Sequence, residues 1–529
     1  MTTTDDHPAA TARAAADTPP FPGVIYQVYP RSFRDGDGDG VGDLRGMRDG
    51  LDHLAWLGVD AVWSSPLYRS PMADFGYDVA DHCDIDPTFG TLADFDAFVA
   101  AARDRGLEVW LDFVPNHTSD QHPWFVASRS SRDDPHRGWY VWRDPAPDGG
   151  PPNNWVRHFA DAPAWTFDDR TGQYYLHHFL PQQPDVNWDD PGLRAAQLDV
   201  LRFWLARGVR GFRADAVHLI GQDRDYPDDP PGLDHYDGRG DHHHHPSALD
   251  HLRAIRGVLD EHGALVVGES YNERPETLAA HVGDDLQHLS FVFHLLEAPW
   301  DAAEWARRIR AVDAAFAPVG GWPSWALGNH DRPRLATRVG GVARARVAAT
   351  VQLTLRGVPC LYQGDELGLE DAEVPPEKVV DPGGRDGCRA PVPWTDEPGA
   401  GWPADPWLPL PPDARARSVA RQQADPASTA SLYRRILRLR RARAELVGGT
   451  QTVLGADDGV PSGLLAVRRE LAGATSVTLA EMADRDVTLT GPWTSGWDVA
   501  IDTAGAGARE GGPFDGTVPA GTAVVLHRR

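Results

Sequence analysis

Eight short apolar runs recur along the chain, and most of them are followed by a segment with helical spacing. Each run ends in a cluster of polar residues, and the runs are GVIYQVYPRSF, GVDAVWSSPLY, GLEVWLDFVPNHT, GVRGFRADAVHL, ALVVGESY, HLSFVFHLL, WALGNHDRPR and TLRGVPCLYQGDE. Strands that alternate with helices form a parallel sheet, and eight such units close into a barrel. We therefore predict an α/β fold, a (β/α)8 barrel of the TIM type, with its functional site at the polar carboxyl ends of the strands.

Two of the helices predicted between these strands carry small or apolar residues at positions i, i+3, i+4 and i+7, which form one face of a helix. After the first run this face comprises Leu51, Leu54, Ala55 and Gly58. After the second run it comprises Phe95, Phe98, Val99 and Ala102. We expect both faces to pack against the barrel.

Two stretches depart from this alternation. Residues 118–190 hold six tryptophans and little helical periodicity, so we predict an inserted subdomain after the third strand. Residues 448–529 consist of short alternating segments between Gly-rich turns, which is typical of a small antiparallel β-sandwich. The barrel would then occupy 21–117 and 191–447, behind a disordered tail over 1–20 that has no apolar signal core.

The composition excludes several classes of partner. The chain has 77 acidic and 51 basic residues, and its formal net charge of -26 repels nucleic-acid phosphates and anionic membrane surfaces. No apolar run reaches the length of about 20 residues that a membrane span needs. The three cysteines, Cys83, Cys360 and Cys388, are too few for a disulfide framework. We expect a cytoplasmic enzyme with a neutral small-molecule substrate and no obligatory protein partner.

Three acidic residues, Asp215, Glu269 and Asp331, come at the ends of the fourth, fifth and seventh runs. A single acid at such a place would as readily cap a helix or form a salt bridge, but a barrel would gather all three at one mouth. Cleavage of a glycosidic bond needs a pair of carboxylates, one to attack the anomeric carbon and one to protonate the leaving oxygen. Arg213, on the same strand face as Asp215, would keep that carboxylate ionised. A neighbouring carboxylate and partial burial would raise the pKa of Glu269.

Five motifs, DFVPNHTS, QPDVNW, GFRADAVH, VVGES and GNHDRPR, follow one another in an order that resembles the alpha-amylase superfamily, glycoside hydrolase family 13, and in particular its exo-acting alpha-glucosidases. The resemblance extends from residue 21 to residue 529. It implies that Asp215 is the nucleophile, Glu269 the acid/base, and Asp331 a third acid that binds ring hydroxyls and favours the distorted sugar. His117 and His330 resemble the paired histidines that bind the same sugar, although isolated histidines of this kind are usually core residues.

The resemblance also predicts the wall of the sugar pocket. In MADFGYDVADH, Tyr77 and Asp78 match the family's G-Y-D, which implies that Tyr77 stacks on the terminal glucose and that Asp78 binds its hydroxyls. The segment GRDGCRAPVPW resembles R-T-P-M-x-W, with Ala390 and Val392 in place of the usual Thr and Met. We expect Arg389 to pair with Asp78 and to close the pocket behind one glucose unit.

Two phenylalanines in the predicted insert, Phe159 and Phe179, match positions at which relatives wall the glucose pocket. The match of Phe159 is the poorer one, because its HFAD departs from the family's F-G-G. Ordinary core packing is the alternative for both side chains.

The segment RDGDGDGVGDLRG places the carboxylates of Asp35, Asp37, Asp39 and Asp43 around Val41. Such a cluster is either solvated by water or gathered by a hard cation. Relatives carry a calcium loop of the pattern D-x-[DN]-x-D-x-[IV]-x-D here, which implies a backbone carbonyl ligand at Val41. Oxygen ligands favour Ca²⁺ over zinc, with Mg²⁺ as the alternative, and the ion would be structural. The run His242–His245 is instead expected to be a surface loop, since neighbours in a run cannot all point at one ion.

We therefore expect a retaining, exo-acting alpha-glucosidase that releases or transfers single glucose units from the non-reducing ends of short alpha-glucosides, through a covalent glucosyl-enzyme intermediate. Ala216 implies a preference for alpha-1,4 bonds, because relatives that cleave alpha-1,6 bonds carry Val at this position. The alternatives are an alpha-1,6-specific oligo-glucosidase and a predominantly transglucosylating enzyme. The three acids disfavour a non-catalytic relative, and Asp78 with Arg389 disfavours an endo-acting amylase.

Overall fold

The computed structural model describes residues 18–528, except 159, 161, 232–244, 271–273, 382 and 494. Its centre is a closed barrel of parallel strands in the order β1-β13-β12-β11-β10-β9-β5-β2. These strands are β1 (Ile25–Val28), β2 (Ala61–Ser64), β5 (Glu108–Phe113), β9 (Gly211–Ala214), β10 (Leu265–Gly268), β11 (Leu289–Val292), β12 (Pro323–Ala326) and β13 (Val358–Tyr362). Each strand overlaps one of the apolar runs, although β12 begins two residues before its run, so the predicted (β/α)8 barrel is confirmed.

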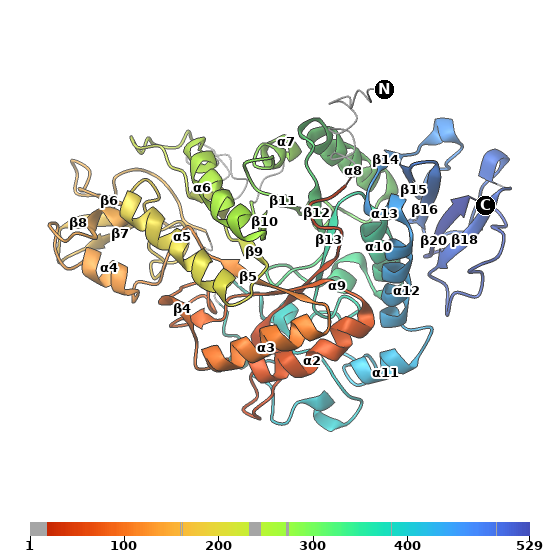
Figure 1. Cartoon of the computed structure of the whole chain (residues 1–529), viewed down its shortest axis with the longest axis horizontal. Coiled ribbons are helices and arrows are strands. Elements are labelled where there is room, and N and C mark those ends of the chain that lie inside the picture. Colours follow the sequence, from red (N-terminus) through yellow and green to blue (C-terminus); the bar gives the residue numbers. More distant parts are fainter. Residues whose placement is uncertain are drawn as a thin grey trace, which may run out of the picture.

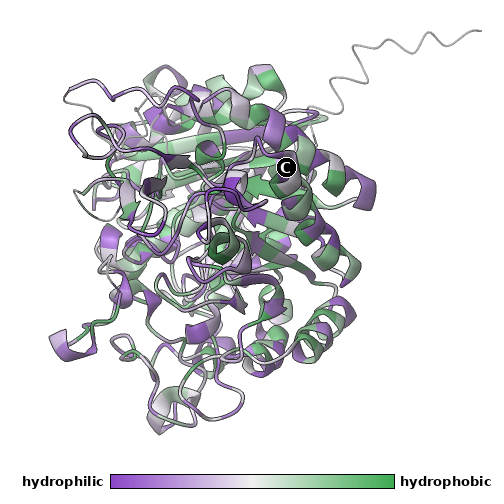
Figure 2. Cartoon of the chain, turned by 90° about the vertical axis from the view of Figure 1, so that its left-hand side faces the viewer, coloured by the Kyte–Doolittle hydropathy of each residue, from purple (hydrophilic) through white to green (hydrophobic). Residues whose placement is uncertain are grey.

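Helices surround the barrel (Figure 1). The long ones are α2 (Leu44–Leu57), α3 (Leu92–Asp104), α5 (Pro191–Ala206), α6 (Ser247–His262), α8 (Ala302–Phe316), α10 (Val342–Thr354) and α12 (Thr429–Ala442). Shorter ones are α4 (Pro123–Ser128), α7 (Pro275–Ala279), α9 (Leu335–Val339), α11 (Val419–Ala424) and α13 (Ala444–Val447). Figure 2 shows hydrophobic residues concentrated on the inner strands and hydrophilic residues on the outer loops.

The apolar face predicted for α3 is confirmed, because Phe95, Phe98, Val99 and Ala102 are all buried. The face predicted for α2 is partly wrong. Leu51 and Leu54 are buried, but Ala55 is exposed and Gly58 lies beyond the helix. Gly58 ends α2 in the left-handed conformation, with a φ of 97°, where glycine pays no steric cost.

Two segments of the first half of the chain leave the barrel, each between a strand and the next long helix. The residues between β5 and α5 include α4 and a three-stranded sheet in the order β6-β8-β7, with β6 (Trp142–Arg143), β7 (Trp165–Asp168) and β8 (Gln173–Leu176). In Figure 1 this sheet lies at the opposite end of the molecule from the C-terminus. In the second segment, which was not predicted, β3 (Tyr68–Arg69) pairs with β4 (Asp81–Ile85) between β2 and α3.

The C-terminal residues form a five-stranded antiparallel sheet in the order β14-β15-β16-β20-β18 and a two-stranded sheet β17-β19, which fits the predicted β-sandwich. The strands are β14 (Thr450–Val453), β15 (Leu464–Leu471), β16 (Ala474–Glu481), β17 (Val487–Thr488), β18 (Trp497–Asp502), β19 (Thr517–Val518) and β20 (Ala523–Arg528).

Two buried arginines bind the chain around the end of α10, and one of them, Arg469, joins the C-terminal sheet to the barrel. Arg469 of β15 donates hydrogen bonds to the carbonyl oxygens of Thr354, Leu446, Gly448 and Thr450. Arg440 of α12 donates to those of Leu353, Leu355 and Gly357. Since α10 ends at Thr354, the two guanidinium groups satisfy carbonyls that the end of this helix would otherwise leave unpaired.

Among the residues that the structure describes, no helix combines the length and the apolar character needed to cross a bilayer.

Candidate active site

The backbone ladder of the barrel positions the first two predicted catalytic acids. Asp215 directly follows β9, and its N–H donates a hydrogen bond of 2.8 Å to the carbonyl oxygen of Phe113 at the end of β5. Glu269 directly follows β10, and its N–H donates a hydrogen bond of 2.9 Å to the carbonyl oxygen of Ala214 at the end of β9. Parallel pairing therefore brings both side chains to the same end of the barrel.

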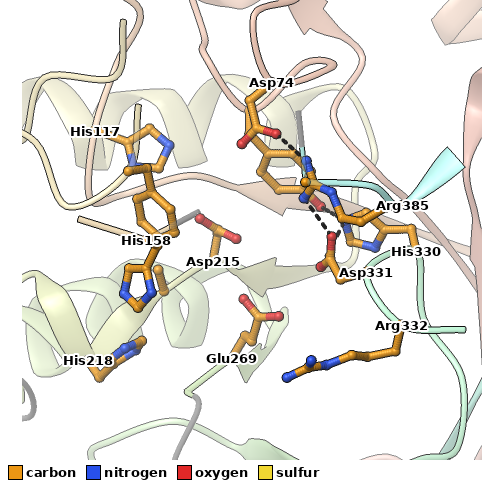
Figure 3. Close-up of a pocket in the computed structure, with 14 residues that line it drawn as sticks. Asp74, His117, His158, Asp215, His218, Glu269, His330, Asp331, Arg332 and Arg385 are labelled. Carbon is orange, nitrogen blue, oxygen red and sulfur yellow. Dashed lines mark hydrogen bonds and ion pairs between the residues drawn. The ribbon is translucent and has the colours of Figure 1, made fainter. Parts of the chain in front are cut away.

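These side chains open into a cavity of about 390 Å³, a size typical of small-molecule sites. Figure 3 shows Asp215, Glu269 and Asp331 pointing toward a shared space. The lining residues are Asp74, Tyr77, His117, His158, Phe179, Asp215, Ala216, His218, Glu269, His330, Asp331, Arg332, Gly383 and Arg385. The structure thus brings together the three predicted catalytic acids and four of the predicted sugar-binding residues, Tyr77, His117, Phe179 and His330.

Arg213 binds three carboxyl groups below this cavity. Its guanidinium lies 2.6 Å from Asp112, 2.7 Å from Asp215 and 2.5 Å from Glu269. The strand register places Asp112 of β5 directly beside Arg213 of β9. Arg213 is only 2% exposed and is absent from the residues that line the cavity, so its contacts in the structure are those of a residue that positions the acids. That Arg213 is also one of the substrate-binding residues stays a prediction.

Burial controls the protonation of these acids. It raises the pKa of Asp215 to about 7 against the opposing charge of Arg213, while Asp112 and Asp331 raise it further. Arg213 acts in the expected direction, because its charge lowers the pKa of Asp215 and favours the carboxylate, but burial outweighs this one shared guanidinium. Burial likewise raises the pKa of Glu269 to about 7, with Asp215 and Asp331 adding to the effect, in the predicted direction.

Asp331 has the opposite electrostatic environment. Burial alone would raise its pKa, but His330, Arg385 and Arg389 outweigh burial and hold the pKa of Asp331 well below its usual range. Its carboxylate lies 2.8 Å from Arg385 and 3.2 Å from Arg389. The site therefore holds one firmly ionised carboxylate beside two whose protonation is balanced near neutral pH.

Tyr77 and His330 form one wall of the cavity. Their rings are nearly parallel, at 5° and a centroid distance of 5.4 Å. The Tyr77 hydroxyl lies 2.8 Å from Nε2 of His330 and 3.1 Å from Asp112, and Nδ1 of His330 lies 2.8 Å from Gln27. Burial lowers the pKa of His330 to about 3, so near neutral pH this ring is uncharged and acts through hydrogen bonds, and its charge bears on Asp331 only in strong acid.

The predicted ion pair between Asp78 and Arg389 is wrong. Asp78 is fully buried away from the cavity and accepts hydrogen bonds from Ser70 and from the backbone N–H groups of Ala73 and Asp74. Arg389 is buried too, and the structure pairs it with Asp331 and Asp381.

The cavity is closed instead by Asp74 and Arg385, each four residues earlier in the same two motifs. Arg385 lies 2.7 Å from Asp74 and 2.8 Å from Asp331, and Figure 3 shows this guanidinium between the two carboxylates. Asp74 is buried at the cavity, and Phe75 directly after it adopts a left-handed φ of 47°. An ion pair between an aspartate and an arginine closes the pocket, as predicted, but the two residues are Asp74 and Arg385.

His117 and Phe179 lie on the opposite side, with ring centroids 5.0 Å apart. Nε2 of His117 lies 3.0 Å from the amide of Gln183, and His158 stacks on Phe179 at 5.1 Å and 26°. The other predicted wall residue, Phe159, lies outside the described residues, as do His242, His243 and His244 of the histidine run.

The acidic loop before α2 lies apart from the cavity. One carboxylate oxygen each of Asp35, Asp37 and Asp39 falls within 4.8 Å of the others, an arrangement that fits a divalent cation. Asp43 has a separate role as the N-cap of α2, since its side chain accepts the N–H groups of Gly36 and Gly46. The N–H of Val41 donates to Asp39.

Sequence reasoning missed several residues of the site. Asp112 begins the motif DFVPNHTS and lies on the buried strand β5. A charged residue inside an apolar strand was the available signal. Asp74 and Arg385 lie inside recognised motifs, but the role of closing the pocket was given to Asp78 and Arg389 in those motifs. His218 and Arg332 lie inside the motifs GFRADAVH and GNHDRPR but were given no role, whereas His158 belongs to none of the five motifs and reaches the cavity only in the folded chain.

Comparisons with known proteins agree with this geometry. The profile of the alpha amylase catalytic domain matches residues 27–449. The chain is 43% identical over 463 residues to a probable alpha-glucosidase of Rhizobium meliloti (strain 1021), which covers 80% of this chain and 83% of that protein. It is 35% identical over 483 residues to the oligo-1,6-glucosidase of Parageobacillus thermoglucosidasius, with 82% and 86% covered.

Solved structures give the same result. The alpha-glucosyl transfer enzyme XgtA superposes with a TM-score of 0.89 at 39% identity, over 97% of this chain and 100% of that one. The trehalulose synthase MutB from Pseudomonas mesoacidophila MX-45 gives a TM-score of 0.88 at 32% identity, over 96% and 99%. The protein therefore belongs to the alpha-amylase family, glycoside hydrolase family 13.

Proposed function

We propose that the protein is a retaining, exo-acting alpha-glucosidase that releases or transfers single glucose units from the non-reducing ends of short alpha-glucosides. The observation that carries this proposal is the closed end of the cavity, where Arg385 bridges Asp74 and Asp331 beside Asp215 and Glu269. A pocket with such a wall accepts the end of a sugar chain and excludes its middle. Relatives named alpha-glucosidase support the same activity.

In the first step, a carboxylate oxygen of Asp215 attacks the anomeric carbon while Glu269 donates its proton to the glycosidic oxygen. The bond to the aglycone breaks with its electron pair, and the aglycone leaves as an alcohol. In the second step, the ionised Glu269 takes a proton from water or from an acceptor hydroxyl, whose oxygen displaces Asp215 from the sugar. Each step inverts the anomeric centre, so the alpha configuration is retained.

The contacts of Arg213 support this retaining mechanism. Two nitrogens of one guanidinium bind Asp215 and Glu269, which keeps the two carboxyl groups close together. Retaining enzymes need a separation of about 5 to 5.5 Å, whereas inverting enzymes need a larger gap for a water molecule. The raised pKa of Glu269 allows it to carry the proton near neutral pH, and the firmly ionised Asp331 stabilises positive charge on the sugar ring.

We propose a preference for alpha-1,4 bonds, because Ala216 lines the cavity directly after the nucleophile and leaves space for a second sugar. The alternatives are an alpha-1,6-specific oligo-glucosidase, favoured by the names of three relatives, and a mainly transglucosylating enzyme, favoured by the name of a structural neighbour.

We also propose that the acidic loop holds a structural Ca²⁺, with Mg²⁺ as the alternative. Asp35, Asp37 and Asp39 would supply carboxylate oxygens and Val41 a carbonyl oxygen, while Asp43 would approach the ion only as far as its role as a helix cap allows. The ion would offset the mutual repulsion of these carboxylates and so stabilise the loop.

For the cellular setting we propose the cytoplasm, with small alpha-glucosides as the only partners and without a role at a membrane or on nucleic acid. The three free cysteines suit a reducing compartment, and the net charge of -26 repels anionic polymers.

A substrate panel tests the proposed function. The panel comprises maltose, maltotetraose, isomaltose, sucrose, trehalose and an aryl alpha-glucoside, with products separated over time and the first glucose followed by proton NMR. We expect alpha-glucose as the first product, and maltotriose together with glucose from maltotetraose. Initial release of beta-glucose would contradict retention, and initial release of maltose from maltotetraose would contradict exo action by single units.

A further inference from the structure

We propose that Trp407 is a positioning residue of the glucose pocket. It connects the back of the pocket to the acidic loop at residues 35–43. The inference rests on the proposed function, because it concerns how the same pocket is held in shape. Trp407 is not among the residues that line the cavity, so its effect passes through the side chains described below.

On its outer side Trp407 is hydrogen-bonded to the acidic loop and to Ser32, which follows strand β1. Its backbone N–H donates a hydrogen bond of 3.0 Å to the carbonyl oxygen of Gly40, whose own N–H donates to Asp35 at 2.9 Å. Its indole Nε1–H donates a hydrogen bond of 3.0 Å to the hydroxyl of Ser32, and that hydroxyl donates to the carbonyl oxygen of Arg389.

On its inner side the indole begins a row of rings that ends in the pocket wall. Trp407 lies 6.4 Å from Tyr29 at 28°, and Tyr29 lies 5.9 Å from His330 at 22°. His330 stacks on Tyr77, and both line the cavity. Ring pairs at these centroid distances attract one another, so a displacement of the indole is transmitted to the two rings that face the sugar.

A second route leads from Trp407 to the acid that closes the pocket. The indole lies 5.6 Å from the ring of Phe75, and Arg31 lies over both rings, at 4.8 Å from Trp407 and 5.5 Å from Phe75. Phe75 has a φ of 47°, a conformation that a bulky residue keeps only when its surroundings hold it. This turn directs the preceding residue, Asp74, toward Arg385.

Two glycines of the acidic loop offer a matched pair of probes. Gly38 and Gly40 have nearly the same φ, +92° and +90°, so alanine would cost similar backbone strain at either position. At Gly40 the new Cβ would lie 2.3 Å from the carbonyl oxygen of Asp405, in the segment that carries Trp407. At Gly38 its closest neighbour would be a carbon of Pro403 at 3.8 Å, an ordinary contact.

The test compares Gly40→Ala with Gly38→Ala in excess calcium, at a temperature at which both are folded. We expect Gly40→Ala to lower kcat/KM for maltose about tenfold and to weaken inhibition by glucose, because a displacement of about 1 Å can cost up to about a hundredfold in rate. Gly38→Ala should stay within about twofold of the wild type. Equal losses in both variants would mean that loop strain alone matters, and would overturn the proposal.

Two changes at Trp407 complete the test. Trp407→Phe keeps a ring between Tyr29 and Arg31, whereas Trp407→Leu removes it, so we expect the phenylalanine variant to recover most of the kcat/KM that the leucine variant loses. If both variants and Gly40→Ala melt earlier but bind glucose and turn over maltose as the wild type does, the role of Trp407 is purely structural and the proposal is wrong. A wild-type protein inactive on every alpha-glucoside would instead contradict the proposed function.

Discussion

The guanidinium of Arg213 sets the chemistry of the site at the residue scale. It binds Asp112, Asp215 and Glu269 at once, and burial raises the pKa of each of these carboxyl groups. One positive charge cannot neutralise three buried negative charges, so the group retains a proton near neutral pH. That proton is what glycosidic bond cleavage requires on the acid/base.

The pH dependence of kcat/KM should therefore be bell-shaped. Activity requires ionised Asp215 and protonated Glu269, so it falls when acid protonates the nucleophile and when alkali deprotonates the acid/base, with apparent pKa values that belong to the pair. Because burial raises the pKa of Glu269 from 4.5 to about 7, the alkaline limb should lie near neutral pH. Rates on maltose across the pH range measure it, and an alkaline limb near pH 4.5 would refute this assignment.

Glu269→Gln provides the control for that profile. An amide cannot donate the proton, so this variant should lose activity on maltose but retain the first step on an aryl glucoside with an acidic phenol, which leaves unaided. The alkaline limb should then disappear with the aryl substrate.

Asp215→Asn should abolish turnover while leaving the fold intact, because the amide cannot form the covalent intermediate. We expect kcat to fall by about a thousandfold or more. A rise in Tm on adding glucose would show that the pocket of the variant still forms. Wild-type rates from a clean preparation would remove Asp215 from the mechanism.

Ala216→Val should shift the ratio of kcat/KM values from maltose toward isomaltose by about tenfold or more, since a methylene-sized change in a pocket is worth roughly 1 to 3 kcal/mol. Ala216 has a φ of 43°, where a β-branched side chain is strained, so the variant should also melt earlier. The ratio is unaffected by that loss, because both substrates meet the same folded enzyme. Ala216→Gly, which relieves the strain without adding bulk, should not favour isomaltose.

Residue assignments are also where sequence reasoning reached its limit. The motifs containing Asp74 and Arg385 were found, but the pairing was given to Asp78 and Arg389. The deciding facts are the positive φ of Phe75 and the short 3-10 helix at Asp386–Arg389, which turn the later residues inward. A motif gives the order of residues along the chain, whereas the direction of each side chain depends on backbone angles that the motif does not encode.

At the scale of elements, the sequence was a better guide. The eight strands of the barrel are buried on both faces, so each appears in the sequence as a continuous apolar run. The hairpin of β3 and β4 was missed because both strands are short and partly exposed, with acidic residues such as Asp81 and Asp84 that disfavour strand prediction. This hairpin frames the segment that carries Asp74 and Tyr77.

The acidic loop before α2 carries a prediction at the same scale. Removal of divalent metal with a chelator should lower Tm more than it lowers the initial rate at room temperature, because an ion that binds only the folded loop stabilises it by mass action. Adding calcium to stripped protein should restore Tm. In Asp39→Ala, which removes one of the three converging carboxylates, calcium should have little effect, whereas Asp84→Ala outside the loop should respond as the wild type does. An unchanged Tm in the stripped wild type would mean that water alone solvates the loop.

For the whole molecule, Arg469 joins the C-terminal sheet to the barrel through its hydrogen bond to the carbonyl oxygen of Thr354 at the end of α10. Arg469→Met should lower the free energy of unfolding by about 3 kcal/mol or more, because each buried carbonyl left unpaired costs about 1 to 3 kcal/mol. Denaturant melts measure this change. The neighbouring Arg468, which points outward to Glu470, supplies the control, and Arg468→Met should change stability by no more than about 0.5 kcal/mol. Equal effects would mean that Arg469 contributes no more than a surface arginine.

The wall built by Asp74 and Arg385 determines how polymers would be degraded. Each encounter consumes one unit from one terminus, after which the shortened chain must dissociate and enter again. The supply of free termini, rather than the mass of polysaccharide, then limits the yield of glucose. A highly branched glucan should be consumed faster than a linear one of equal mass, and the viscosity of a starch solution should persist long after reducing sugar has begun to accumulate.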